Sequence, residues 1–206
     1  MERRLLEWFS THGRDLPWRH TRDPYAILVS EVMLQQTQVE RVVPRYRAWL
    51  ERWPTPEALA HAPAAEAIRA WQGLGYNRRA LNLQRAARRI VDEFGGRVPS
   101  DLATLESLPG VGPYTARAVA AIAFGVPVGA VDTNVRRVLG RIAAGADGTM
   151  TPSEMQRLAD GVVPHDRPGD WTHALMDVGA TLCRPRGPDH EACPARPWCR
   201  WCGYPV

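Results

Sequence analysis

The sequence predicts an all-α protein. Apolar residues recur at helical spacing along most of the 206 residues, and the alternating β-branched runs that are typical of strands are few. Glycine and proline interrupt this pattern repeatedly, which is typical of short loops between helices. A chain of this length is expected to form one large domain or two small interlocked ones, and either arrangement can bury a hydrophobic core.

Ten helices are expected from this periodicity and its interruptions. Asp23-Pro24, Pro54-Thr-Pro56 and Gly95-Gly96 separate the early helices. Ser100-Asp101 and Thr151-Pro152 favour helix starts, because a side-chain oxygen can cap the first turn and proline suits its first position. The tail after residue 183 is rich in Pro, Arg and Trp and shows little helical pattern. Such a segment needs an additional cross-link to be ordered. The predicted helices cover residues 2–12, 25–36, 38–52, 63–71, 79–94, 101–107, 113–124, 132–144, 152–161 and 170–182.

The composition narrows the classes of function. The formal net charge is +4, which is compatible with a nucleic-acid partner. The chain contains no lysine, so all 26 basic residues are arginine and no lysine can form a Schiff base with a sugar aldehyde. Neither a membrane span nor a secretory signal is recognisable. We therefore expect a cytoplasmic, nucleoid-associated protein without a membrane partner, whose cysteines bind metal rather than form disulfides.

The segment Leu-Pro-Gly-Val-Gly-Pro-Tyr-Thr-Ala at residues 108–116 predicts a tight turn that opens a helix. Gly110 and Gly112 allow positive φ and close approach, and Pro113 suits the first helical turn. The backbone N–H groups of such a turn can bind a phosphate, or a monovalent cation that bridges to one. An ordinary connection between two helices is the simpler alternative.

Four cysteines are concentrated in the tail, at Cys183, Cys193, Cys199 and Cys202. Buried free thiols would be unusual in a segment this short and irregular. Four thiolates in a compact loop suit a tetrahedral zinc site, and they equally suit an iron–sulfur cluster. The spacing alone does not separate these two metals.

Several motifs share their order with one known family. They are Arg14-Asp-Leu-Pro-Trp-Arg19, Ser30-Glu-Val-Met-Leu-Gln-Gln-Thr-Gln-Val39, Gly73-Leu-Gly-Tyr76, the turn at 108–116, Val131-Asp-Thr-Asn-Val135 and Met176-Asp-Val-Gly-Ala180. Together they resemble the helix–hairpin–helix DNA glycosylases of the endonuclease III and MutY class. The string at residues 30–39 is most similar to the MutY adenine glycosylases.

This resemblance implies a helix–hairpin–helix glycosylase fold, with two helical subdomains that flank a DNA-binding cleft. One subdomain would be a six-helix unit over residues 22–124. The other would combine residues 1–21 with residues 125–206 and would carry an iron–sulfur loop at residues 183–202. The partner is then double-stranded DNA with a mismatched or damaged base, and we expect a monomer.

The chemistry also points to two carboxylates, Glu31 and Asp132. Cleavage of an N-glycosidic bond passes through an oxocarbenium-like state, for which one acid and one carboxylate are a natural pair. Glu31 lies in an apolar stretch, where burial would raise its pKa as a general acid requires; a helix-surface position is the alternative. Asp132 begins a helix, where an N-cap role is the simpler interpretation and where the helix dipole keeps a carboxylate ionised.

The resemblance assigns Glu31 to the acid that protonates adenine and Asp132 to the family's essential aspartate. It maps Tyr114 and Asn134 onto hydrogen-bonding partners in the same catalytic site. Bifunctional relatives carry at the position of Tyr114 a lysine that attacks the sugar and permits strand cleavage. We therefore expect a monofunctional enzyme that leaves an abasic site.

The resemblance further implies a [4Fe–4S] cluster, whose family motif is C-x6-C-x2-C-x5-C. Cys183, Cys193 and Cys199 fit its first, third and fourth places, while its second place falls on His190. Either His190 is the fourth ligand or Cys202 replaces it. We favour Cys202, because thiolate is the usual ligand in such clusters.

A flipped base leaves a gap that the protein must fill. Gln35, Gln36 and Tyr76 match family positions that contact DNA near the lesion, although they could also be polar helix-end residues and a packed aromatic. The turn would grip phosphate through its backbone without reading sequence. Arginines at 78–79 and 85–89 could add phosphate contacts or form a solvated helix face. The positions expected to contact DNA or the base are Arg14, Leu16, Trp18, Arg19, Gln35, Gln36, Tyr76, Gly110, Val111 and Gly112.

Three functional hypotheses remain. The first is excision of adenine mispaired with guanine or 8-oxoguanine, although MutY enzymes usually continue into a second domain that recognises 8-oxoguanine and this sequence ends after the cysteines. The second is removal of uracil or thymine opposite guanine, or of another damaged base, since short relatives with this chemistry exist. The third is a non-catalytic DNA-binding or redox-sensing cluster protein. Intact Glu31 and Asp132 favour an enzyme.

Overall fold

A computed structural model describes residues 1–202, and within that range it contains helices and no strand, as the sequence predicts. The chain divides into two compact units. Unit 1 consists of residues 1–14 and the segment from residue 125 onward, and unit 2 consists of residues 15–124. No helix in the described part is long and apolar enough to cross a membrane.

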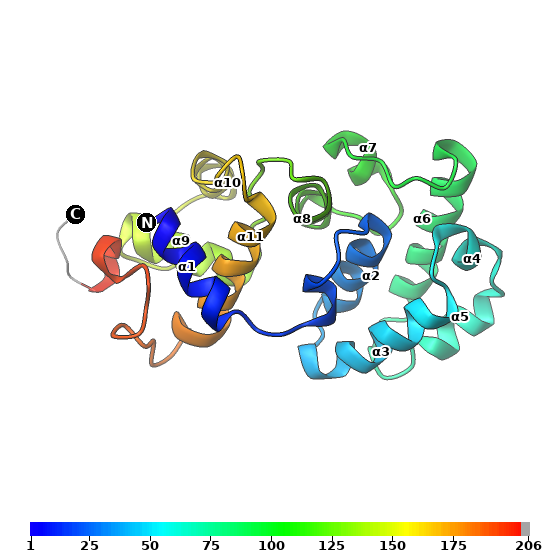
Figure 1. The fold of residues 1–206 in the computed structure, drawn as a ribbon, viewed down its shortest axis with the longest axis horizontal. Helices are drawn as coiled ribbons and strands as arrows, with labels where there is room; N and C mark the ends of the chain where they lie inside the picture. Colours follow the sequence, from blue (N-terminus) through cyan, green and yellow to red (C-terminus); the bar gives the residue numbers. More distant parts are fainter. Residues whose placement is uncertain (203–206) are drawn as a thin grey trace. The chain divides into compact units, whose positions relative to one another are not determined.

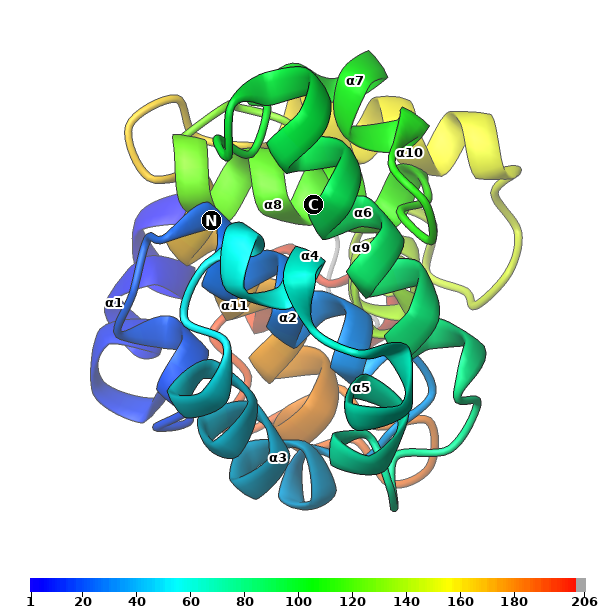
Figure 2. The same ribbon diagram turned by 90° about the vertical axis from the view of Figure 1, so that its right-hand side faces the viewer.

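Unit 2 is built from seven helices and one short 3₁₀ turn: η1 (Pro17–Arg19), α2 (Pro24–Leu34), α3 (Val39–Arg52), α4 (Pro56–His61), α5 (Ala64–Ala70), α6 (Arg78–Phe94), α7 (Leu102–Ser107) and α8 (Pro113–Phe124). Helix α2 packs against α3 and α8, and α6 packs against α4 and α5 (Figure 1, Figure 2). Three tryptophans join this core edge to face, since Trp49 contacts both Trp53 and Trp71.

Helix α2 is the central helix of unit 2, and its sequence explains why. Asp23 caps its first turn by accepting a hydrogen bond of 3.1 Å from the Tyr25 N–H, and Pro24 fits the next position. The residues from Tyr25 to Met33 are apolar on nearly all sides and are all buried. A helix that is hydrophobic all round belongs in a core, so Glu31 lies on an element that offers it little water.

Unit 1 contains the remaining elements: α1 (Glu2–His12), α9 (Thr133–Ala144), α10 (Pro152–Gly161), α11 (Pro168–Asp177) and the turns η2 (Val178–Leu182), η3 (Arg196–Trp198) and η4 (Arg200–Cys202). Helix α1 lies beside α11, and α9 contacts α10, α11, η2 and η4 (Figure 1). Its core collects Leu5 and Leu6 of α1, Val138 and Leu139 of α9, and Trp171 of α11. The cysteine tail therefore packs against the helix that follows Asp132.

The structure corrects three details of the predicted elements. Helix α4 is absent from the prediction, because Pro54-Thr-Pro56 is equally typical of a break; instead, Thr55 caps the new helix by accepting from the Ala58 N–H, and Pro56 is its first residue. Helix α2 ends at Leu34 rather than at residue 36. The last predicted helix begins at Pro168 and changes at residue 178 into the wider turn η2, which closes with a 2.7 Å bond from the Cys183 N–H to the Val178 carbonyl.

Residues 15–21, which the prediction places with the terminal segments, group with unit 2. The packing of Trp18 gives the reason. This residue is 3 % exposed, and its ring meets the Tyr46 ring edge to face, with centroids 5.4 Å apart. The η1 turn also contacts α2. The indole therefore fixes this segment to the core of unit 2.

Candidate active site and cysteine loop

Glu31 is a buried carboxyl on α2, with 4 % of its surface exposed. Its neighbours Ser30 and Val32 are buried as well, and the Ser30 hydroxyl is already bonded to the Ile27 carbonyl at 2.8 Å. The helix-surface alternative for Glu31 is therefore wrong. The burial that the apolar sequence around Glu31 predicts is therefore confirmed.

The end of α2 lies against the turn between α7 and α8. The Gln35 amide donates to the Gly110 carbonyl at 3.5 Å and to the Thr115 hydroxyl at 3.4 Å. Gln35 is only partly exposed, and Gln36, the next residue, is exposed. The segment after Glu31 and the helix–hairpin–helix turn thus form one continuous surface of unit 2.

Of the two glycines in the turn at residues 108–112, only Gly110 has a positive φ. Gly110 has a φ of +81°, and a Cβ there would come within 2.8 Å of the Asn82 Cβ, so both conformation and space require glycine. Gly112 is not in the left-handed region, so the positive φ that glycine allows is used at Gly110 and not at Gly112. A Cβ at Gly112 would meet nothing within 4 Å, and this open space leaves the backbone accessible to a ligand.

Val111 lies between these glycines and is 6 % exposed, so its side chain belongs to the core and only its backbone can serve a ligand. Tyr114 is the second residue of α8 and is half-buried, while Thr115 beside it is buried. These side chains anchor the turn. Part of its backbone is also engaged, since the Val111 N–H donates to the Leu108 carbonyl at 3.1 Å and the Gly112 carbonyl accepts from the Ala116 N–H at 2.9 Å.

Gln36 and Tyr76 both adopt the left-handed region, with φ of +55° and +48°. Tyr76 is 70 % exposed, which is unusual for a large aromatic side chain. Both residues are therefore accessible to a partner. The alternative that Tyr76 is a packed aromatic residue is wrong. Arg78 is exposed, whereas Arg79 points inward and bonds to main-chain carbonyls. The expectation that Arg79 contacts phosphate is therefore wrong.

In unit 1, Asp132 caps α9 and also binds Asn134. Its Oδ1 accepts from the Val135 N–H at 2.6 Å, and its Oδ2 accepts from the Asn134 amide at 3.1 Å. The N-cap interpretation is confirmed, and it fixes the carboxylate at the positive end of a helix dipole. Asp132 and Asn134 thus form a preorganised pair.

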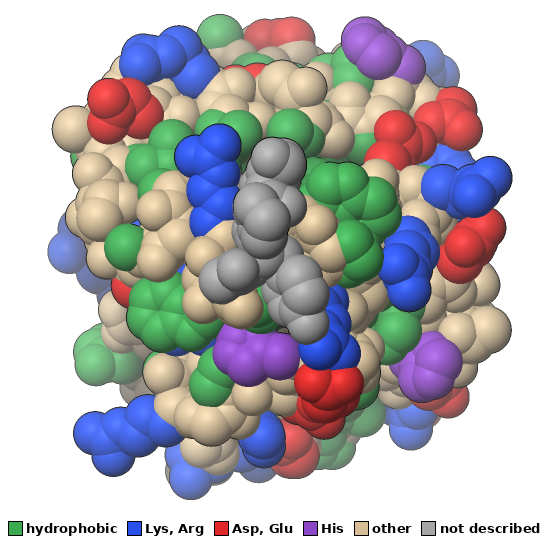
Figure 3. Space-filling model, turned by 90° about the vertical axis from the view of Figure 1, so that its left-hand side faces the viewer, with side chains coloured by type: hydrophobic (Ala, Val, Ile, Leu, Met, Phe, Trp, Pro, Cys, Tyr) green, Lys and Arg blue, Asp and Glu red, His purple; other side chains and the backbone are tan. Residues whose placement is uncertain are grey.

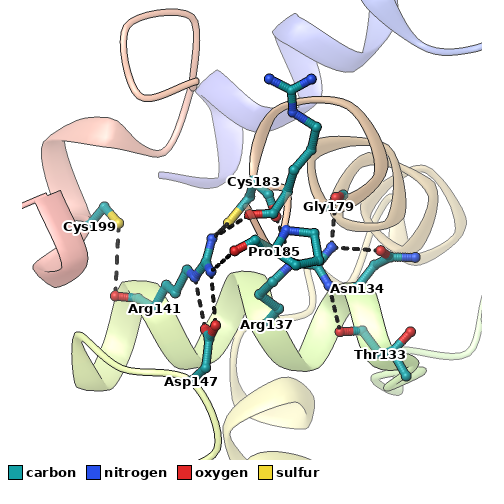
Figure 4. Close-up of polar contacts among 10 residues, drawn as sticks. Thr133, Asn134, Arg137, Arg141, Asp147, Gly179, Cys183, Pro185 and Cys199 are labelled. Carbon is teal, nitrogen blue, oxygen red and sulfur yellow. Dashed lines mark hydrogen bonds and ion pairs between the residues drawn. The ribbon is translucent and has the colours of Figure 1, made fainter. Parts of the chain in front are cut away.

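Arg137 extends this pair towards the cysteine tail (Figure 4). It donates to the Asn134 side-chain oxygen at 2.8 Å, to the Gly179 carbonyl at 2.7 Å and to the Cys183 carbonyl at 2.6 Å. One guanidinium therefore ties α9, η2 and the first cysteine together. Periodicity gives no indication of this role, because Arg137 is one of several arginines on α9.

The segment at residues 14–19 is divided between the units. The Arg14 side chain and backbone N–H bind the carboxylate of Asp177, which is fully buried, at 2.7 and 2.9 Å. Leu16 and Trp18 are buried in unit 2, and Arg19 is half-buried. Trp18 is thus a core residue rather than one exposed at a base pocket. Asp177 is not among the predicted site residues, although it lies in the motif at 176–180.

The four cysteines and His190 lie in one loop of unit 1. Burial raises the pKa of Cys193 to about 11, and negative charge at Cys183 and Cys199 adds to the shift. Burial, a hydrogen bond and charge from Cys199, and charge from Cys193 raise the pKa of Cys202 to about 12. The Cys202 sulfur also contacts His190 Nδ1 at 2.5 Å, so both candidates for the fourth ligand occupy the same place.

These residues suit a thiolate-bound metal in their chemistry, although their geometry is not that of a formed site. No group of three or more His, Cys, Asp or Glu side chains within residues 1–202 has the arrangement of a metal centre. The fit therefore rests on the donor set and its surroundings. Arg141 is 2 % exposed, donates to the Cys183 sulfur at 3.6 Å and forms an ion pair of 2.8 Å with Asp147 (Figure 4). A buried cation beside the sulfurs is a favourable environment for a negatively charged thiolate cluster.

The surface charge is mixed on the face drawn in Figure 3. Outside the grey atoms, arginines alternate there with carboxylates, histidines and apolar groups rather than forming one continuous basic patch. On α6, Arg88 binds the Ala60 carbonyl, and Arg89 binds Glu93 and the Ser107 carbonyl. Those two arginines have intramolecular partners, whereas Arg85 is exposed.

Comparison with known proteins shows which family this chain is similar to. Residues 29–165 match the model of the HhH-GPD superfamily base excision DNA repair proteins. The human adenine DNA glycosylase is 47 % identical over 95 % of this chain, and the adenine DNA glycosylase of Mycolicibacterium smegmatis is 47 % identical over 98 %. The chain spans 38 % of the human protein's length and 70 % of the mycobacterial one.

A solved structure agrees with the fold of the whole chain. A thermostable thymine-DNA glycosylase superimposes with a TM-score of 0.91 and is 34 % identical. The match covers 98 % of this chain and 94 % of that structure. The fold class predicted from the sequence is therefore confirmed, while its relatives act on two different bases.

Proposed function

Because the chain belongs to the HhH-GPD superfamily of base excision DNA repair proteins, we propose that it is a monofunctional DNA glycosylase that removes mispaired adenine from double-stranded DNA. The observation that carries the proposal is the buried carboxyl of Glu31 in a chain 47 % identical to an adenine DNA glycosylase over 98 % of its length. The proposed substrate is adenine opposite guanine or 8-oxoguanine, and one chain acts as a monomer.

In the proposed reaction, the adenine leaves the helical stack before its bond to the sugar breaks. Glu31 donates a proton to the base, because a protonated purine is the better leaving group. The C1′–N9 bond then breaks and the sugar becomes oxocarbenium-like. Asp132, held in position by its cap and by Asn134, stabilises that positive charge. Water adds to C1′ and loses its proton to a carboxylate, and the products are free adenine and an abasic site.

Tyr114 supports the absence of lyase chemistry. A lyase step that uses lysine needs a primary amine to attack C1′ and form a Schiff base, and the chain contains no lysine. Tyr114 opens α8 beside the turn, where it can hydrogen-bond but cannot form an imine. We therefore propose that the enzyme leaves the DNA strand intact.

We propose that Cys183, Cys193, Cys199 and Cys202 hold a [4Fe–4S] cluster. When bound, the cluster would cross-link a tail that has few regular elements, and this cross-link would keep the tail ordered. Cys202 is the proposed fourth ligand, because thiolate is the usual ligand of iron in such clusters. His190 would then lie next to the cluster rather than bind it.

A second candidate substrate is thymine or uracil opposite guanine. The observation that favours it is the TM-score of 0.91 with a thymine-DNA glycosylase along nearly the full length of both chains. The two candidates share the fold and differ in the base that the enzyme accepts.

One panel of duplexes tests both candidates. Duplexes with A:8-oxoG, A:G, T:G, U:G and hypoxanthine pairs are incubated with the protein, treated with alkali and examined for strand breaks. Breaks only at adenine support the leading proposal, and breaks only at thymine or uracil support the second. If wild type cleaves none of these bases and Asp132→Asn binds the duplexes equally well, the protein is a non-catalytic DNA-binding protein.

A further inference from the structure

Two residues of unit 2 share an unfavourable backbone conformation. Within residues 1–202, Gln36 and Tyr76 are the non-glycine residues with positive φ. L-residues adopt this region rarely, because the Cβ approaches the neighbouring carbonyl oxygen. Both residues are exposed, so the packing of their own side chains in a core does not impose the conformation. Something else in the structure must therefore hold them.

The Arg79 guanidinium connects the two segments. Its Nη1 donates to the carbonyls of Val32, Met33 and Gln35 at 3.0, 3.0 and 2.6 Å. Its Nη2 donates to the Thr37 hydroxyl at 3.0 Å, and to the carbonyls of Leu74 and Gly75 at 2.7 and 3.0 Å. One nitrogen thus binds the end of α2, and the other joins Thr37 to the turn that precedes Tyr76.

The carbonyls at the end of α2 explain why a cation lies there. The last carbonyls of a helix have no intrahelical donor and form its negative end, so a positive charge beside them is favoured. Because α2 stops at Leu34, its final carbonyls are available to the guanidinium. The Thr37 hydroxyl reinforces the same connection through contacts with the Gln35 and Leu74 carbonyls at 3.2 and 3.3 Å.

Aromatic rings complete the surroundings of Arg79. Its guanidinium carbon lies 5.4 Å from the centre of the Trp71 ring and 5.9 Å from that of Tyr76. The Trp71 indole donates to the Gly75 carbonyl at 3.1 Å. Arg79 is therefore in contact with the ring of Tyr76 as well as with the backbone before it.

We propose that Arg79 is a positioning residue that holds Gln36 and Tyr76 together in the conformation in which they enter DNA beside the flipped base. The inference rests on the proposed glycosylase function. Arg79 itself does not touch the base; it acts by fixing the two segments, residues 34–38 and 73–77, against each other. A planar group with two separate nitrogens is required, because a lysine ammonium can serve one segment but not span both.

The test compares Arg79→Lys with Arg69→Lys, the same change at an exposed arginine of α5 in the same unit. Hydrogen exchange is measured by mass spectrometry on both variants and wild type without DNA. We expect both segments to exchange at least ten-fold faster in Arg79→Lys, while α8 and the middle of α6 stay as protected as in wild type. Unchanged exchange in either segment would overturn the proposal, and this measurement does not depend on activity.

Kinetics then test whether the positioning acts through the two side chains. Single-turnover excision should slow at least ten-fold in Arg79→Lys and less than two-fold in Arg69→Lys. In a background of Gln36→Ala and Tyr76→Ala, Arg79→Lys should cause less than a two-fold further loss, because the groups that it positions are absent. Independent, multiplicative losses would show that Arg79 acts in another way and would overturn the inference.

The outcomes also separate this inference from the proposed function. If wild type excises no base, the proposed function fails. The exchange result still supports or overturns the inference that Arg79 holds residues 34–38 and 73–77 together. If wild type is active and both arginine variants match it, only the inference fails. If Arg79→Lys does not fold, Thr37→Val is used instead, because it removes one partner of the guanidinium. The same two segments should then exchange faster, with a smaller increase in rate. No increase in exchange would overturn the proposal.

Discussion

Arg137 donates a hydrogen bond of 2.6 Å to the Cys183 carbonyl, and so α9 is joined directly to the first cysteine of the tail. The same guanidinium binds Asn134, which in turn binds Asp132. One side chain therefore contacts both the cysteine loop and the partner of the proposed catalytic carboxylate.

Replacing Arg137 should disturb both regions. In Arg137→Gln, the Cys183 and Gly179 carbonyls lose a charged donor, and each such bond contributes about 1.5–3 kcal/mol. We expect a lower melting temperature and slower excision per folded molecule. Calorimetry and single-turnover kinetics measure the two effects. Arg136→Gln, which removes only a long contact of 3.4 Å to the Met150 carbonyl, is the control; equal behaviour of the two variants would contradict the linkage.

Asp132→Asn should remove activity and leave the fold intact. Asparagine caps a helix about as well as aspartate, but it cannot supply the negative charge that the oxocarbenium-like state requires. We expect excision to fall by about 10²–10⁴-fold, a typical effect of losing a positioned catalytic group, with little change in melting temperature. Asp132→Ala should in addition lose about 1 kcal/mol of stability with the cap. Substantial activity in Asp132→Asn would argue against the assigned role.

Glu31→Gln tests the proposed proton donor. Glutamine has nearly the same shape, and because the buried site no longer holds a group that can ionise, stability should be unchanged or higher. We expect excision of adenine to be lost while the variant still binds mismatched duplex, as a gel-shift assay would detect. Glu2→Gln, at the start of α1, is the surface control. Retained excision would mean that another group protonates the base.

Tyr114→Lys tests the lyase prediction. Wild type should leave an abasic site without strand cleavage and should form no covalent DNA adduct on treatment with borohydride, because it contains no lysine. The variant places an amine at the start of α8, and we expect an adduct that borohydride traps. An adduct with wild type, above the level seen with Glu31→Gln, would contradict the monofunctional assignment.

Cys202→Ser and His190→Ala distinguish the two candidates for the fourth cluster ligand. With a thiolate at Cys202, the serine variant should lose iron and sulfide, while His190→Ala should keep both and the brown colour of the cluster. Metal analysis and the visible absorption spectrum provide the readouts. The reverse pattern would assign the ligand to His190, and zinc without sulfide in wild type would exclude the cluster.

Much of the architecture follows from local sequence. The all-α fold and most of the helix positions depend on apolar spacing, caps such as Asp23 and Thr151, and the glycines between elements, all of which act over a few residues. The burial of Glu31 is predictable for the same reason, since most residues of α2 around it are apolar. Helix α4 escapes prediction because Pro54-Thr-Pro56 can break a helix as well as begin one.

Most helix positions, the absence of lysine and the motif residues are visible in the sequence, because they depend on residue type and short-range spacing. The folded structure was needed to show that Arg79 points inward to two segments, that Gly112 has no positive φ, and that Arg137 links Asn134 to Cys183. An arginine looks the same in sequence whether it faces water or carbonyls. Its partners are chosen by packing between segments that can lie far apart in the chain, as with Arg79 and Gln35, which are 44 positions apart.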